Sequence, residues 1–155
     1  METSRISDQL SRSVHGPAWH GPSMEEVLKD VTAGNATVRV CGATHSIAEL
    51  LLHAAAWARA SRLAMDGVAI PEDLPDDWTT LDSLDEAEWT HLRKDALAEL
   101  DQITAKTAEF PEARLTERVP GRNFDFYFNL HGVAQHTIYH AGQIAILKRQ
   151  INASA

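Results

Sequence analysis

Apolar side chains recur every three or four residues in three long segments of this sequence, and this spacing constrains the fold more than any other feature. A period of about 3.6 residues places them on one face of an α-helix, where they pack against other helices. The segments span residues 46–66, 83–110 and 123–152, and a shorter helix fits residues 3–15. Four such helices predict an all-α fold, a four-helix bundle.

A serine followed three residues later by glutamate marks the expected start of three helices. In such a capping box, the serine hydroxyl and the glutamate carboxylate accept hydrogen bonds from free amides of the first turn. The pairs are Ser23 and Glu26, Ser46 and Glu49, and Ser83 and Glu86. The first pair predicts a short additional helix over residues 23–33. Loops carry the prolines, only residues 37–40 suggest a β-strand, and we expect one domain over residues 1–155.

Composition restricts the partners and the compartment. The formal net charge of −8 repels phosphate backbones, so we expect no nucleic-acid partner. No run approaches the roughly 18 apolar residues of a membrane span, and the polar N-terminus lacks the apolar segment of a signal peptide. The single cysteine, Cys41, excludes an intramolecular disulfide. These features favour a cytoplasmic protein without a membrane segment.

The strongest candidate site is the pair His136 and His140 in the segment HTIYH. Residues four apart lie on one helical face, so both imidazoles can converge on one ion. The alternative is two separately hydrogen-bonded histidines, which is common for an isolated pair. Three further polar residues share their helical face, within an apolar stripe, and such a row usually lines a site: Asp125, Asn129 and Gln143. Threonine at position 137 excludes the HExxH motif of metalloproteases.

His53 lies in the most apolar part of the 46–66 segment. A lone histidine there would usually be a core-edge residue bonded to a carbonyl. If its helix packs beside the last one, His53, His136 and His140 supply three neutral nitrogen ligands and leave coordination positions open for water or substrate. That arrangement is typical of a reactive metal site. We expect zinc or nickel, with Gln143 and Tyr139 as candidates for orienting ligands; Tyr139 could instead pack in the core.

The remaining candidates for metal ligation are weaker: His20, His45, His91, His131 and Cys41. His20 lies on a loop from which it could reach the mouth of a site. His45 precedes a helix cap, where a capping or surface role is expected. His91 lies in a charged segment, and His131 points away from the histidine pair. The cysteine is a potential soft ligand, although a small buried thiol is the simpler interpretation.

Two segments, SIAELLLHAAAW at 46–57 and GVAQHTIYHAGQI at 132–144, resemble the DinB/YfiT-like metal-dependent family. The segments WHGPS at 19–23 and VPGR at 119–122 are also similar to its members. The resemblance spans nearly the whole chain. It implies a four-helix bundle, often a homodimer, with nickel or zinc held by three histidines. The matching positions here are His53, His136 and His140.

The resemblance implies a function as well as a site. Relatives include thiol-dependent S-transferases and a mycothiol-dependent isomerase, and many members have no known substrate. We therefore expect a small-molecule substrate, with a low-molecular-weight thiol as a candidate, and transfer or hydrolysis at an open metal. The alternative is a non-catalytic dimeric bundle or small-ligand binder with a structural metal. Thr137 departs from the family pattern, where an acidic or amide residue is frequent, and no catalytic residue can be named.

Overall fold

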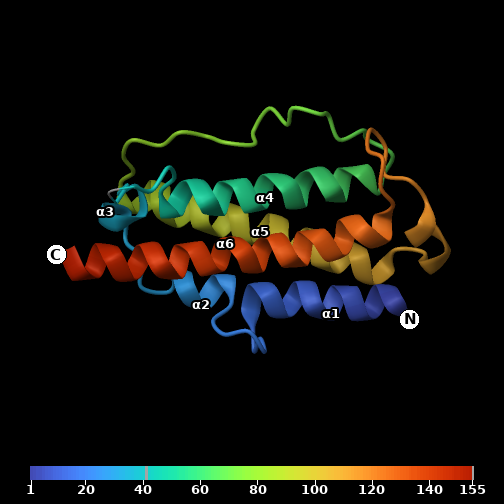
Figure 1. The fold of residues 1–155 in the computed structure, drawn as a ribbon, viewed down its shortest axis with the longest axis horizontal. Helices are drawn as coiled ribbons and strands as arrows, with labels where there is room; N and C mark the ends of the chain where they lie inside the picture. Colours follow the sequence, from blue (N-terminus) through green and yellow to red (C-terminus); the bar gives the residue numbers. More distant parts are fainter. Residues whose placement is uncertain (41, 155) are drawn as a thin grey trace.

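Four long helices form the body of the described chain, with three short helical segments beside them (Figure 1). The computed structural model describes residues 1–40 and 42–154. The helices are α1 (Glu2–His15), α2 (Met24–Leu28), α3 (Ala33–Ala36), α4 (Ile47–Ala64), α5 (Glu86–Glu109), the 3-10 helix η1 (Glu112–Thr116) and α6 (Phe126–Ser154). Among the described residues, β-structure is limited to two isolated bridges. The predicted all-α bundle with short additional helices is confirmed.

The direction of the helices decides which residues meet. In Figure 1, α4 and α5 run the same way, while α1 and α6 run the opposite way. A long loop, residues 65–85, leaves the end of α4 and returns along its whole length before α5 begins. Because α4 packs against α6 in antiparallel orientation, the middle of one helix faces the middle of the other.

The core lies between the four long helices. On α1, Ile6, Leu10 and Val14 are buried at intervals of four residues, as expected for one helical face. Trp89 of α5 is 1% exposed, and its indole Nε1 donates to the carbonyl of Val31 at 2.8 Å. Burial of these side chains fixes the helices against one another.

Two of the three predicted capping boxes are confirmed. Ser23 begins α2 and Ser46 begins α4, each with its glutamate three residues later. The third prediction is wrong, because α5 begins after Asp85 and the box is completed by Glu88. Glu86 instead accepts a hydrogen bond from the amide of Ala33 at 3.0 Å, at the start of α3.

Two other helices and one expected strand differ from the sequence prediction. The helix expected over residues 23–33 is replaced by α2, which ends at Leu28, and α3, which begins after Thr32; the Val31 carbonyl between them accepts from Trp89. Residues 37–40 form no strand. The last helix begins at Phe126 and not near residue 123, since the carboxylate of Asp125 accepts from the amide of Phe128 at 2.9 Å.

The 65–85 loop is attached to the turn that precedes α6. The amide of Ile70 donates to the carbonyl of Pro120 at 2.9 Å. Gly121 follows with φ of 79°, and a Cβ there would lie 2.5 Å from the Ile70 carbonyl oxygen. Only glycine fits this close approach. The Pro120-Gly121 turn therefore holds one end of the loop that crosses α4.

Two predictions from composition concern a membrane span and the single cysteine. None of the helices in the described residues combines the length and the apolarity that crossing a membrane requires. Cys41 lies outside the described residues, so the expectation of a buried thiol stays a prediction.

Candidate metal centre

Three histidine side chains from two helices converge at the middle of the bundle. The Nε2 atom of His136 lies 3.0 Å from Nε2 of His53 and 2.9 Å from Nε2 of His140. One potential ligand atom from each ring lies within 4.8 Å of the other two. His53 and His140 are buried, and His136 is half-buried. The antiparallel packing of α4 and α6 thus brings His53 next to His136 and His140, which lie one helical turn apart.

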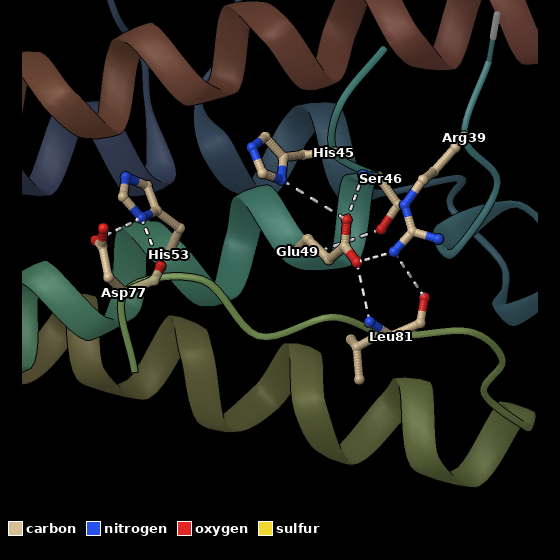
Figure 2. Close-up of polar contacts among 7 residues, drawn as sticks. All are labelled: Arg39, His45, Ser46, Glu49, His53, Asp77 and Leu81. Atoms are coloured by element: carbon tan, nitrogen blue, oxygen red, sulfur yellow. Dashed lines mark hydrogen bonds and ion pairs between the residues drawn. The ribbon is translucent and has the colours of Figure 1, made fainter. Parts of the chain in front are cut away.

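The His53 ring is oriented by the loop that crosses α4. Its Nδ1 lies 2.7 Å from the backbone carbonyl oxygen of Asp77 and 3.0 Å from that residue's carboxylate (Figure 2). A carbonyl oxygen only accepts hydrogen bonds, so Nδ1 carries the proton and Nε2 presents a lone pair. Trp57 donates from Nε1 to the Asp77 carboxylate at 2.6 Å and holds it in place.

The His140 ring is oriented by its own helix. Its Nδ1 lies 2.6 Å from the side-chain oxygen of Gln143, which accepts the proton and leaves Nε2 free. The amide nitrogen of Gln143 donates to the Tyr139 hydroxyl at 3.4 Å. Tyr139 is 63% exposed, so the possibility that it packs in the core is wrong. Gln143 supports the site through a histidine.

The donor set fits a divalent transition metal. The unprotonated Nε2 atoms of His53 and His140 both face Nε2 of His136. A neutral His136 ring carries at most one proton on Nε2, so it can donate a hydrogen bond to only one of these two nitrogens. A cation at the point of convergence satisfies all three lone pairs. Two nitrogens bound to one tetrahedral ion at 2.0–2.1 Å are about 3.3–3.4 Å apart, close to the spacing here. Imidazole suits zinc and nickel alike.

Burial keeps two of these rings neutral. Removal from water lowers the pKa of His136 to about 3, and repulsion from charge on His140 and His53 adds to the effect. Removal from water also lowers the pKa of His140, to about 4; the bond to Gln143 opposes this shift, and nearby histidines reinforce it. Both rings are therefore free of competing protons at neutral pH, as metal ligation requires.

An indole side chain covers the site from the loop. Trp78 stacks on His53 with ring centroids 3.9 Å apart and on His45 with centroids 3.6 Å apart. His45, for which the sequence suggests a capping or surface role, is therefore half-buried beside the site and outside its ligand group. Neither Asp77 nor Trp78 was predicted from the sequence. Their only signal was a position in a long loop without secondary structure, a kind of loop that is often functional.

A buried carboxylate ties the loop and α4 together next to the site. Glu49 is 2% exposed; it accepts from the amides of Ser46 and Leu81, each at 2.9 Å, and pairs with Arg39 (Figure 2). Burial alone would raise the Glu49 pKa, but these hydrogen bonds and the Arg39 charge lower it below its usual value. The carboxylate stays ionised and anchors the loop at Leu81, four residues after Asp77.

The other histidines lie away from the ligand group. His131 contacts Tyr127, with ring centroids 4.6 Å apart, and is not part of the ligand cluster. His91 is exposed and lies 3.1 Å from Asp95. His20 lines a separate surface hollow beside α1 and does not reach the cluster.

Comparison with known proteins identifies the family of this chain. The sequence profile of the DinB superfamily matches residues 18–144, a range that includes all three histidines. This chain belongs to the DinB superfamily. Searches of curated proteins and of solved structures gave no match. Family membership and the geometry agree that the histidine cluster of this DinB-superfamily protein could hold a metal ion.

A groove of about 390 Å³ in this DinB-superfamily bundle adjoins the cluster. His53 and His136 form part of its lining, together with Trp57, Ser61, Asp77, Phe124, Phe128, Asn129, Gly132 and Val133. A larger hollow of about 520 Å³ between α4 and α5 contacts none of the three histidines. The groove is therefore the better candidate for a ligand that reaches the histidine cluster.

Proposed function

We propose that this protein is a metal-dependent enzyme that holds one zinc or nickel ion through Nε2 of His53, His136 and His140. The observation that supports this most strongly is the orientation of the rings. The Nδ1 atoms of His53 and His140 both face oxygen acceptors, so their Nε2 lone pairs point to the same place as Nε2 of His136. When bound, such an ion lowers the pKa of a coordinated thiol or water.

An open coordination position supports a catalytic role over a structural one. Within the described residues, no fourth histidine, cysteine or carboxylate joins the ligand group. Structural zinc sites usually have four protein ligands, whereas catalytic sites have three. The groove lined by His53 and His136 gives a small molecule access to the remaining position.

The side chains around the site favour thiol transfer over hydrolysis. Hydrolysis normally uses a general base beside the metal, and the nearest carboxylate, Asp77, is occupied by Trp57 and His53. A thiol starts from a pKa of about 8.5, far below that of water, so coordination to the ion ionises it to the nucleophilic thiolate more readily and without a further base. We therefore propose a small electrophilic substrate and a low-molecular-weight thiol as cosubstrate. Asp77 and Gln143 are positioning residues that act through the histidines.

Metal titration tests the proposal directly. Metal-stripped protein should bind one equivalent of zinc or nickel, and replacement of any one of His53, His136 or His140 by alanine should abolish tight binding. His131→Ala is the matched control on α6 and should bind as the parent does. If His53→Ala binds as tightly as the parent, the three-histidine site is wrong. A metal-loaded protein that turns over no thiol with halogenated or epoxide electrophiles would favour the non-catalytic alternative.

We also propose that two copies associate through the outer face of α6. Tyr139 and Ile146 are 63% and 59% exposed and lie seven residues apart, which places them on the same face of the helix. Exposed apolar side chains that share a helix face are typical of an interaction surface. A homodimer would cover them.

A further inference from the structure

The groove beside the histidines has two chemically different ends. Because α4 and α6 are antiparallel and His53 faces His136, residues after His53 lie opposite residues before His136 (Figure 1). Ser61 follows His53 by two turns on the same face of α4, and Asn129 precedes His136 by two turns on α6. Both residues line the groove. The histidines therefore mark one end and this polar pair the other.

The walls between the two ends are apolar. Trp57, Phe124, Phe128 and Val133 line the groove, and the last three come from α6 or the turn before it. In the part of the chain that the structure describes, no lysine or arginine contributes to the lining. The one carboxylate, Asp77, already accepts from Trp57. Such walls suit an uncharged aromatic ring.

The polar end contains two buried atoms without partners. Ser61 is 0% exposed and Asn129 8% exposed, and neither the Ser61 hydroxyl nor the Asn129 side-chain oxygen has a hydrogen bond in the described structure. Other helical hydroxyls here donate to the carbonyl four residues earlier, at 2.7–2.9 Å: Thr104, Thr107 and Thr137. Ser61 makes no such bond. Buried polar groups are normally paired, so these two are suited to pair with a ligand.

A glycine keeps the middle of the groove open. Gly132 lies within α6, and a Cβ built there would meet no atom within 4 Å. Glycine inside a helix is less stable than alanine, and no steric contact requires it here. Its lack of a side chain leaves space in the groove that it lines.

We propose that the groove binds a single-ring aromatic compound that carries a hydroxyl group, with the hydroxyl at Ser61 and Asn129 and the opposite end at the three histidines. A hydroxyl donates to the Asn129 oxygen and accepts from the Ser61 hydroxyl. A carboxylate cannot donate, and an ammonium cannot accept. The placement of the opposite end rests on the metal proposed above.

The separation of the two ends along α4 selects the substitution pattern. The eight residues from His53 to Ser61 rise about 12 Å along α4. A metal bond of about 2 Å at one end and a hydrogen bond of about 3 Å at the other leave roughly 7 Å. That span fits a benzene ring with substituents at para positions. It is too short for two fused or linked rings with substituents at both ends.

Two matched probes test the hydroxyl. Zinc-loaded protein is titrated with 4-hydroxybenzohydroxamate and with benzohydroxamate, which lacks only the ring hydroxyl, and binding is measured by calorimetry. The hydroxylated probe should bind about tenfold more tightly, since a good hydrogen bond contributes about that factor. Ser61→Ala and Asn129→Leu should remove most of this difference. Equal binding of the two probes to the parent protein would overturn the proposal, because the ring hydroxyl would then make no net contribution to binding.

A pair of glycine variants tests the location. Gly132→Leu should weaken both probes at least tenfold by filling the groove. Gly142→Leu is the matched control, because its Cβ also meets no atom within 4 Å and it does not line the groove. It should bind both probes as the parent does. Unchanged binding by Gly132→Leu would place the ligand elsewhere and refute the proposal.

Thermal stability distinguishes a ligand-binding role from a structural one. In protein without probe, Ser61→Ala and Asn129→Leu should keep or raise the melting temperature, because each removes a buried polar atom without a partner. Ser13→Ala should lower it by about 3 °C, since the Ser13 hydroxyl is buried and donates to the Leu10 carbonyl at 2.7 Å. A similar loss in Ser61→Ala would show a structural bond and contradict the proposal.

A metal-free experiment separates this proposal from the proposed function. Metal-stripped protein is titrated with 4-methylphenol and toluene and followed by chemical shifts of groove residues. Preferential binding of the phenol that Asn129→Leu abolishes would support the hydroxyl site even if no zinc binds. Absence of that preference, in a protein that does bind zinc through its histidines, would refute the hydroxyl site alone.

Discussion

Lowering the pH should destabilise the metal-free protein through two of its buried histidines. Burial holds the pKa of His136 at about 3 and that of His140 at about 4, against 6.5 in the unfolded chain. Below pH 6.5 the unfolded chain therefore binds more protons than the folded one. Stability falls as the pH drops from 6.5 and levels off only when the pH passes the two folded-state pKa values.

The size of the effect follows from the same pKa values. One pKa unit corresponds to about 1.4 kcal/mol, so at pH 5 each ring costs at most about 2 kcal/mol relative to pH 7. His136 is only half-buried, and solvent screening reduces its share. We expect a total loss of about 2–3 kcal/mol between pH 7 and pH 5. For a chain of this size, this lowers the melting temperature by roughly 5–10 °C.

Urea unfolding of metal-stripped protein at pH 7 and pH 5 measures this difference. Joint replacement of His136 and His140 by glutamine should remove most of it, while His91→Gln, at an exposed position, should leave it unchanged. His15 acts in the opposite direction, because its bond to Glu25 raises its pKa and its stabilisation is lost as the pH rises. Equal stability of the parent at both pH values, or a double variant that keeps the parent's dependence, would refute the reasoning.

Three further predictions concern the groups around the site. Gln143→Leu should weaken zinc binding 10–100-fold in a calorimetric titration, because His140 loses its hydrogen-bond acceptor. Asp77→Ala should weaken it by no more than about tenfold, because the backbone carbonyl of residue 77 still accepts from His53. Gly121→Ala should destabilise the protein by about 2–4 kcal/mol in urea unfolding, since its Cβ would collide with a backbone oxygen at 2.5 Å. Light scattering should give a dimer mass for the parent and a monomer mass for Tyr139→Glu.

Helix spacing was sufficient to predict most of the fold and the convergence of His136 and His140. The i, i+4 relation fixes His136 and His140 on one face regardless of tertiary structure. Placing His53 beside them required that the 46–66 segment pack next to the last helix, which the family resemblance implied and the structure shows. The misplaced start of α5 has a local cause, because Ser83 and Asp85 both begin a pattern that ends in glutamate three residues later.

The loop over α4 could not be predicted, because its position depends on contacts between residues far apart in the sequence. Asp77 reaches His53 across 24 residues, and Ile70 is held by Pro120 across 50. The spacing of apolar residues along the sequence gives no information about such long-range pairs. Local patterns therefore predict which residues share a helix face, and long-range hydrogen bonds decide how a loop covers that face.

The same loop links the orientation of the ligands to access for a substrate. Its Asp77 carbonyl fixes the proton on Nδ1 of His53 and so frees Nε2, while its Trp78 ring stacks on that histidine. The Asp77 carboxylate, held by Trp57, also forms part of the groove wall. A displacement of the loop would therefore alter the first ligand and the groove together. Hydrogen bonds hold the loop on both sides of Asp77 and Trp78, at Glu49 and at the turn before α6, and so oppose such a displacement.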